Sequence, residues 1–350
     1  MKLKHRLHKI AHWEYWSTPT IYLPLFPVWL YCAWRAKTLL FFHGANPSIK
    51  YGGMAMESKK EIYDLIPENW IPKTIFASSE ISFSEILSEL KSQTINFPII
   101  AKPNIGLKGL GVVEIKNTAE LENYHQNNRF DFLIQEKINF TNEVGIFYHR
   151  FPDEKKGKIT GMVKKEFLSV KGNGKKTLRE LVMENPRSAF QIKAIEQNLG
   201  NEIQKIVPEN EEIILIPFGS HTRGAKFIDI SNEITENLVQ KIDEICTKVN
   251  GFYFGRLDVM FENLELLKNG ENFKIIEING SKSEPTHMYD PKHSLFFAWK
   301  EITKHWRIMA EISRRNHEKG FPYLNLKEGF LALKNNLAIE KKLREISSVD

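Results

Sequence analysis

The sequence predicts a protein of mixed helices and strands in which antiparallel strands carry the functional side chains. Residues 251–261 and 273–280 both alternate apolar and polar residues with the period of two that is typical of strands. Asn269-Gly270 between them is a turn signal, so the pair is expected to form a hairpin. Residues 80–91 and 234–249 have instead the spacing of amphipathic helices.

Composition limits the class of protein. The chain has 350 residues, 42% of them hydrophobic, which is enough to bury one large core or roughly two to three small ones. Its formal net charge of +6 is dispersed, which suits an anionic substrate or a membrane surface and does not favour a nucleic-acid partner. The two cysteines, Cys32 and Cys246, lack the spacing of a metal site, so a reduced, cytoplasmic compartment is expected.

The hairpin gathers charged and polar side chains on one face. Alternation places Arg256 with Asp258 on the first strand and Glu277 with Asn279 on the second. Burying two carboxylates without a partner is costly, so a cation is expected between them. Few and open oxygen ligands suit Mg²⁺, or Mn²⁺, carried by a nucleotide phosphate. The alternative is a surface hairpin whose acids are solvated.

Arg-x-Asp followed by Glu-x-Asn on adjacent strands resembles the metal-binding end of the ATP-grasp carboxylate–amine ligases. These include D-alanine–D-alanine ligase, glutathione synthetase and the ligase half of cyanophycin synthetase. The resemblance covers residues 59–312, about three quarters of the chain. It implies an α+β ATP-grasp fold with two antiparallel-rich lobes holding ATP between them. It also assigns Asp258, Glu277 and Asn279 to the metal and Arg256 to a developing oxyanion.

The amino-terminal segment, residues 1–36, is aromatic and basic. Residues 16–34 are an uncharged stretch of 19 residues, long enough for a tight membrane span but interrupted by three prolines. No small-residue cleavage site follows, so an ordinary signal peptide is not expected. Aromatic sequence between basic flanks fits peripheral membrane contact through residues 13–34. The other interpretation is packing on the protein itself or on another subunit.

Residues 37–78 are interpreted as a reduced form of the domain that precedes ATP-grasp domains. A short strand is expected at residues 38–42 and a short helix at residues 57–65. Ser58-Lys59 before that helix resembles the entry into ATP-grasp domains. A preceding domain normally supplies a parallel sheet that helps to hold the carboxylate substrate, and too few residues are available for it here.

A lysine and a glycine-rich loop follow in the first subdomain, residues 79–140. The strand at residues 97–102 delivers Lys102, whose ammonium is a point charge for phosphate. Glycines let backbone N–H groups turn toward phosphate oxygens, although the spacing is neither that of a P-loop nor that of a dinucleotide fingerprint. The loop resembles the phosphate flap of ATP-grasp enzymes, and its expected nucleotide-binding residues are Gly106, Lys108, Gly109 and Gly111.

The segment between the lobes resembles the adenine-binding edge of the family. There Glu136, Lys137 and Ile138 would border the adenine, and Glu143, seven residues after Glu136, would accept from the ribose hydroxyls. In isolation the same segment would be a surface strand with ordinary charges. The second subdomain is expected at residues 141–312, followed by a tail at 313–350 whose last thirty residues would form two short helices.

Lys164 and Lys165 lie on a strand expected over residues 158–170. One of them would reach the γ-phosphate, as a basic residue does in related ligases. Alternation places the two lysines on opposite faces, and Lys165 is preferred.

Substrate contacts are expected in two loops. The first holds His221 and Arg223 within a cationic cluster suited to a carboxylate or phosphate, although a solvated loop would explain it too. The second follows Asn279, where family members place substrate-binding groups. Its candidates are Ser281, Ser283 and His287, whose spacing departs from the D-alanine ligase pattern.

The resemblance implies an ATP-dependent ligase. The cysteine usage predicts a cytoplasmic location, and the aromatic amino-terminal segment leaves the inner membrane face open. A small-molecule carboxylate would attack the γ-phosphate, and an amine would then displace phosphate from the acyl phosphate. Arg256, Lys102 and Lys165 are the expected catalytic residues. A small-molecule kinase and a non-enzymatic, membrane-bound ATP-binding adaptor are the alternatives, and a homodimer is the habit of the family.

Overall fold

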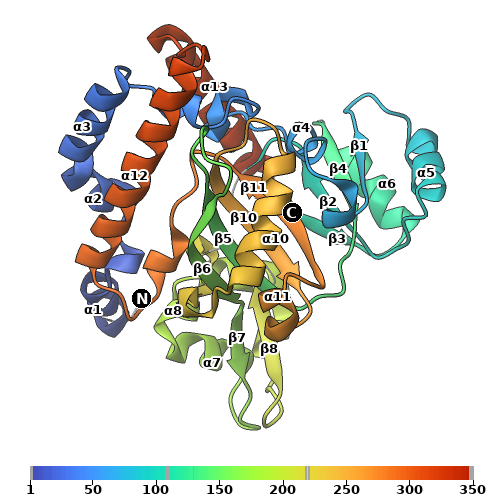
Figure 1. The fold of residues 1–350 in the computed structure, drawn as a ribbon. Coiled ribbons are helices and arrows are strands. Elements are labelled where there is room, and N and C mark those ends of the chain that lie inside the picture. The colour runs from blue at the N-terminus through green and yellow to red at the C-terminus, as the bar shows by residue number, and fades with distance from the viewer. Residues whose placement is uncertain (1–2, 107–110, 129, 217–218, 220, 347–350) are drawn as a thin grey trace.

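The computed structural model describes residues 3–106, 111–128, 130–216, 219 and 221–346 (Figure 1). Its first sheet is antiparallel and has the strand order β1-β4-β2-β3. The strands are β1 (Thr74–Ala77), β2 (Ile99–Pro103), β3 (Val113–Ile115) and β4 (Phe132–Glu136). Two helices, α5 (Phe83–Ser92) and α6 (Thr118–Asn127), cover this sheet and share a core with it.

The second sheet is also antiparallel and forms the centre of the molecule. Its order is β11-β10-β5-β6-β9, and helix α10 (Glu236–Lys248) packs on one face (Figure 1). Fully buried Leu238 and Ile242 of α10 meet buried residues of β5 and β10, as the amphipathic pattern predicts. The strands are β5 (Asn142–His149), β6 (Lys158–Glu166), β9 (Lys226–Asp229), β10 (Phe254–Phe261) and β11 (Phe273–Asn279).

A smaller unit follows β6 in the chain and has a sheet of its own. It consists of the antiparallel pair β7 (Leu168–Lys171) and β8 (Glu212–Ile216) with three short helices and a core of its own. The helices are α7 (Leu178–Glu184), α8 (Pro186–Ala189) and α9 (Ile192–Leu199).

Segments from the two halves of the chain pack together beside the central sheet. Helix α3 (Phe26–Ala36) runs along α12 (Leu295–Glu318), and both share one core (Figure 1). Within the described residues, no helix is long and apolar enough to cross a membrane. The remaining helices here are α1 (Leu3–Ala11), α2 (Thr18–Tyr22) and α13 (Leu326–Ile346).

The structure corrects three local expectations. Residues 38–42 form turns instead of a strand, because Lys37 ends α3 in the left-handed conformation (φ 59°) and the chain then folds back under it. The carboxy-terminal tail contains one long helix, α13, and not two short ones. Asn269-Gly270 is not a two-residue hairpin turn: Gly270, with φ 75°, ends the short helix α11 (Leu264–Lys268).

One buried amide attaches the amino-terminal loops to the central sheet. Asn46 is fully buried, and its Nδ2 donates to the carbonyls of Gly52 (3.0 Å) and Phe254 (2.8 Å). Its Oδ1 accepts from the backbone N–H groups of Tyr253 and Phe254, both at 2.9 Å. Every polar atom of the side chain is therefore used, and the start of β10 is fixed by it.

We expect Asn46→Ala to lower the free energy of unfolding by about 2–4 kcal/mol, because it leaves buried backbone groups without partners. Urea unfolding followed by circular dichroism measures the change. The matched control is Asn232→Ala at an exposed position, which should change the value by less than about 0.5 kcal/mol. Equal effects of the two substitutions would show that Asn46 is not the anchor.

Candidate functional site

Strands β10 and β11 bring four predicted residues onto one face. In their antiparallel register Arg256 pairs with Asn279, and Asp258 pairs with Glu277. All four border a cavity of about 1170 Å³ that also reaches residues of the first sheet. The cavity therefore lies where the two sheets meet, as the sequence predicts.

A β-bulge in β11 changes which residues of this strand face the cavity. The register shifts between Asp258 and Val259, so that Ile276 is the extra residue opposite this step. Ile276 and Glu277 both border the cavity, while Ile275 and Ile278 stay buried in the core. The bulge frees the carbonyl oxygen of Ile276, which accepts from the hydroxyl of Tyr63 and from Lys102 Nζ at 3.3 Å.

Asp258 is the centre of a buried charge network. Arg256 donates to both of its oxygens, at 2.9 and 3.0 Å, and Lys165 Nζ lies 3.0 Å from Oδ1. Burial alone would raise the pKa of Asp258, but Arg256 and then Lys165 outweigh it and lower the pKa to about 2. The carboxylate is therefore ionised at neutral pH.

Lys165 links a second carboxylate to this network. Its Nζ donates to Glu143 Oε1 at 2.5 Å, and both side chains are buried. Burial opposes the charge of Lys165, but Asp258 and Glu143 together raise its pKa. Of the two neighbouring lysines on β6, Lys165 borders the cavity and Lys164 does not.

Two glycines make room for these side chains. A Cβ on Gly145 of β5 would lie 3.1 Å from Arg256 Cδ and 3.0 Å from Val163 Cγ1. A Cβ on Gly219 would lie only 2.6 Å from both Glu143 Oε2 and Lys165 Cδ. Larger residues at either position would displace the charged groups.

Lys102 connects the first sheet to the second. Its ammonium donates to Tyr63 Oη (2.7 Å) and Gln135 Oε1 (3.0 Å), in addition to the Ile276 carbonyl. The side chain is buried, and burial lowers its pKa to about 8, although Glu277 acts in the opposite direction. A fraction of this lysine is therefore neutral in mildly alkaline solution.

Lys59 is a site residue that sequence reasoning missed. It is the first residue of α4 (Lys59–Tyr63), and its Nζ lies 3.6 Å from Glu277 and donates to the Gly106 carbonyl at 3.3 Å. Burial lowers the pKa of Lys59. Ser58-Lys59 resembles the entry into ATP-grasp domains, but the sequence does not show that Lys59 points into the cavity, which depends on how α4 packs.

The predicted nucleotide-binding residues are placed unevenly. Gly106, Glu136, Lys137, Ile138 and Glu143 border the cavity. Glu143 faces Lys165, while Gly111 does not border the cavity. Lys108 and Gly109 lie outside the described residues.

The predicted substrate residues divide into two groups. Ser281, Ser283 and His221 border the cavity, although the hydroxyls of Ser281 and Ser283 donate to backbone carbonyls of Gly52 (2.7 Å) and Gly280 (2.5 Å). Arg223 does not border the cavity.

The expectation for His287 needs correction. This histidine is buried beneath β6, where Gly161 leaves space for its ring, and its Nε2 lies 3.2 Å from Glu301 of α12. It does not border the cavity. The sequence could not show this, because Glu301 approaches from a separate helix.

The donor set fits a magnesium ion only if a ligand supplies further oxygens. Asp258 and Glu277 are cross-strand neighbours of like charge, and Asn279 lies beside them with its Nδ2 3.3 Å from Asp258 Oδ2. Across the described residues, no group of three or more His, Cys, Asp or Glu side chains could hold a metal ion. Two carboxylates and one amide leave coordination positions for phosphate oxygens, which is how Mg²⁺ is usually bound with nucleotides.

No protein-family model matches the sequence, and a comparison with curated proteins finds no match. Several solved structures are similar. A bifunctional glutathione synthetase from Pasteurella multocida has 14% identity and a TM-score of 0.39, covering 75% of this chain and 36% of its own. The VanG D-Ala:D-Ser ligase from Enterococcus faecalis has 13% identity and a TM-score of 0.41, covering 75% and 61%.

A D-alanine-D-alanine ligase from Coxiella burnetii has 10% identity and a TM-score of 0.41, covering 77% of this chain and 59% of its own. The chain thus spans about a third to three fifths of the solved chains named here. The two antiparallel sheets with their helices, and one cavity bordered by both, confirm the α+β architecture of two antiparallel-rich lobes that the sequence predicts.

The lowered pKa of Lys102 predicts a pH-dependent affinity for ATP, the nucleotide expected from the sequence. As pH rises through about 8 the ammonium loses its charge, so the Kd for ATP should increase by up to about tenfold per pH unit between pH 8 and 9.5. Calorimetric titrations across this range measure it. Lys102→Arg stays charged and should show no such increase, whereas the same increase in both proteins would exclude Lys102 as its origin.

Proposed function

We propose that the chain is an ATP-dependent ligase that joins a small-molecule carboxylate to an amine. The observation that supports this most directly is the convergence of Arg256, Asp258, Glu277 and Asn279 with three lysines in one cavity between two sheets. Around Glu143, Asp258 and Glu277 the cavity gathers four cationic side chains, those of Lys59, Lys102, Lys165 and Arg256. Such a site suits an anionic nucleotide carrying a divalent cation.

The proposed reaction has two steps. An oxygen of the substrate carboxylate attacks the γ-phosphorus of ATP, and the bond from that phosphorus to the oxygen of the β-phosphate breaks. ADP is the leaving group, and the product is an acyl phosphate. The amine nitrogen then attacks the acyl carbon, loses a proton, and expels phosphate. Mg²⁺, when bound by Asp258, Glu277 and Asn279, would neutralise phosphate charge that otherwise repels the carboxylate.

The side chains of this chain have distinct parts in the proposal. Lys59 and Lys102 would hold the phosphates in line by charge, and Lys165 would face the transferred phosphoryl group. Arg256 would stabilise the oxyanion of the second step, an effect worth roughly 3 kcal/mol at comparable sites. Arg256 is already oriented for this by its two hydrogen bonds to Asp258.

Glu277→Gln is the substitution that tests the metal assignment most cleanly. We expect turnover to fall by about 100-fold or more because the cation loses a charged ligand. The unfolding free energy should change little, since Glu277 is partly exposed and its nearest cation lies 3.6 Å away. Glu271→Gln, at an exposed position just before β11, is the control. Near-normal ATP consumption by Glu277→Gln would refute the assignment.

Asp258→Asn should also abolish turnover, but it removes the charge that pairs with two buried cations, Arg256 and Lys165, so it tests the metal assignment less cleanly.

Hydroxylamine distinguishes the ligase from the two alternatives. A ligase supplied with ATP and its carboxylate substrate forms an acyl phosphate, which hydroxylamine converts to a hydroxamate. A kinase that phosphorylates a hydroxyl consumes ATP and gives no hydroxamate. An adaptor would bind ATP without turnover on any acceptor from a panel of small acids and amino acids.

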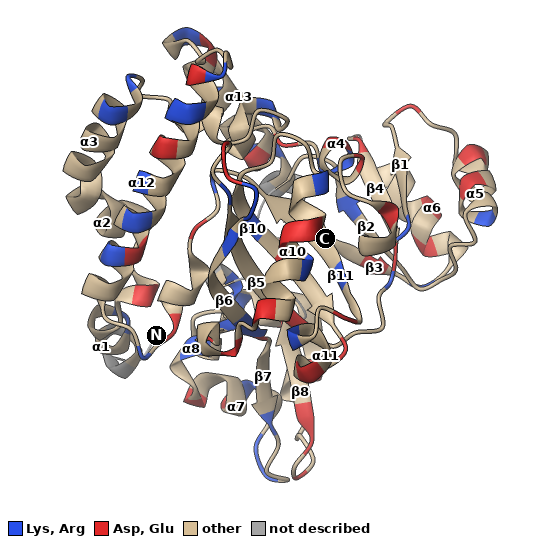
Figure 2. Cartoon of the chain, viewed as in Figure 1, with Lys and Arg blue, Asp and Glu red and all other residues tan. Residues whose placement is uncertain are grey.

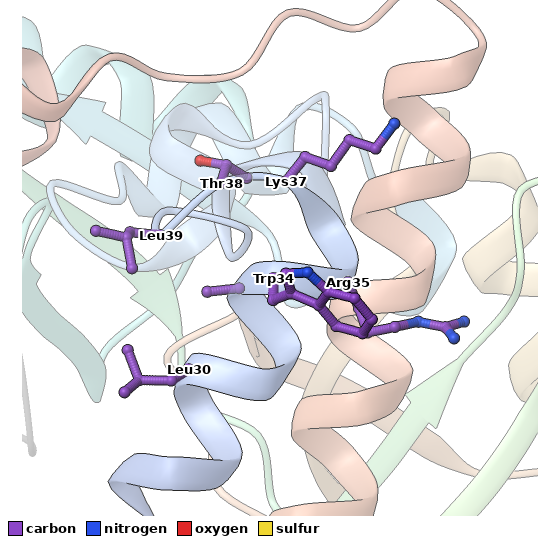
Figure 3. A pocket seen from close by; sticks show the side chains of 7 residues that line it. Leu30, Trp34, Arg35, Lys37, Thr38 and Leu39 are labelled. Atoms are coloured by element: carbon purple, nitrogen blue, oxygen red, sulfur yellow. The ribbon is translucent and has the colours of Figure 1, made fainter.

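We also propose that the outer face of α3 contacts a lipid surface. Leu23, Phe26, Leu30 and Trp34 recur at helical spacing and have exposed fractions of 72, 53, 45 and 73%. Figure 2 shows α2 and α3 almost without charge, and Figure 3 shows Leu30, Trp34 and Leu39 beside Arg35 and Lys37 around a surface hollow of about 610 Å³. Aromatic side chains next to exposed cations suit an anionic headgroup region.

Vesicle sedimentation tests this contact. The chain should bind vesicles containing about 30% anionic phosphatidylglycerol, and Phe26→Asp combined with Trp34→Asp should weaken binding at least about tenfold. Ile206→Asp, at another exposed apolar residue outside this helix, should have no effect. If the double substitution leaves vesicle binding unchanged, α3 is not the contact surface.

A further inference from the structure

The cavity changes character along β10. Asp258, Arg256 and Phe254 point to the same side of the strand, and each borders the cavity. Beyond Arg256 the wall therefore passes from charged to apolar. The apolar part, here called the chamber, is bordered mainly by the amino-terminal segment and α12. Its principal wall residues are Trp16, Ile21, Tyr22, Trp29, Ile302 and Trp306.

Specific contacts fix the chamber walls in place. Trp299 Nε1 of α12 donates to the Ile21 carbonyl at 2.9 Å, and Trp13 Nε1 donates to the His293 carbonyl at 2.9 Å. The ring of Trp306 lies 5.1 Å from that of Trp29 and 5.8 Å from that of Tyr22. The amino-terminal segment thus forms one wall of the chamber and is held to α12 by these contacts.

A carboxylate without a cationic partner lies at the edge of the chamber. Glu284 accepts hydrogen bonds from the hydroxyls of Tyr22 and Tyr289, the latter at 3.1 and 3.2 Å. Over the described parts of the chain, no lysine, arginine or histidine nitrogen lies within 4.0 Å of it, whereas the nearby Glu14 is paired with Arg187 at 2.8 Å. Glu284 and Arg256 both border the cavity, so the carboxylate of Glu284 faces the same space as the charged residues of β10.

We propose that the chamber binds an amine substrate with a large apolar group, whose ammonium is held by Glu284 between Tyr22 and Tyr289 and gives one proton to that carboxylate before the nitrogen attacks. This inference rests on the proposed ligase function and names the class of its second substrate. The two tyrosine hydroxyls orient the carboxylate, and a ligand ammonium supplies the missing charge. The apolar group fills the space between α12 and the amino-terminal segment, where water would gain few hydrogen bonds.

Calorimetric titration of the full chain without nucleotide tests the chamber directly, with n-octylamine, ethylamine, n-octanol and octanoate as probes. We expect octylamine to bind at least about 100-fold more tightly than ethylamine, because the longer chain buries more methylene groups. It should also bind more tightly than octanoate, whose charge Glu284 repels. Equal binding of octylamine and ethylamine, or tighter binding of octanoate, would overturn the proposal.

Glu284→Gln isolates the charge, since it keeps the shape of the side chain. Octylamine binding should weaken at least about tenfold, while octanol binding should stay within about twofold. Glu265→Gln on the exposed surface of α11 is the matched control and should change neither. Equal losses for octylamine and octanol would show that Glu284 has a structural role and would overturn the ammonium assignment.

The outcomes separate this inference from the ligase proposal. Octylamine binding that depends on Glu284, together with no hydroxamate from any carboxylate, would support the amine-binding chamber and refute the ligase function. Hydroxamate formation without octylamine binding would do the reverse. Ile302→Trp adds a second check: it should fill the chamber, weaken octylamine and octanol alike, and leave ATP affinity unchanged.

Discussion

The ionised carboxylate of Asp258 is the constraint on which the arrangement of the central sheet depends. A buried charge is stable only with charged or hydrogen-bonding partners, and here they come from β6, β10 and β11. The three strands must therefore keep one register relative to each other. The bulge at Ile276 extends the constraint to the other sheet, because the carbonyl that it frees accepts from Lys102 of β2. The contacts that pair the charges in the cavity thus also fix the position of the two sheets relative to each other.

The amino-terminal segment has two apolar faces with different surroundings. One face packs on α12 and closes the chamber, and its indole hydrogen bonds show that it belongs to the folded molecule. The other face, along α3, is exposed. The sequence had offered packing and membrane contact as competing interpretations of the same residues. In the structure the amino-terminal segment packs on α12, and the exposed face of α3 is the surface proposed to contact lipid.

Periodicity in the sequence was sufficient to predict most helices and strands. It was insufficient where contacts between distant residues determine the local structure or the site. The strands that carry Lys102, Lys165, Arg256 and Glu277 form where the period of two placed them. Residues 38–42 also look like a strand, but no strand in the described part of the chain pairs with them, and the buried amide of Asn46 holds the adjoining loop. Lys59 was missed for a similar reason: a lysine at the start of a short helix gives no local sign that two sheets converge on it.

By itself the sequence determined which side chains share a strand face, because Cβ atoms alternate along a strand whatever its partners are. It therefore established that Arg256 accompanies Asp258 and that Glu277 accompanies Asn279. Only the tertiary structure decided which faces meet. It placed His287 behind the sheet against Glu301, and it brought Tyr22 to Glu284 across 262 residues. Such contacts depend on how helices pack on sheets, and that packing is set by burial summed over the whole chain and not by any local pattern.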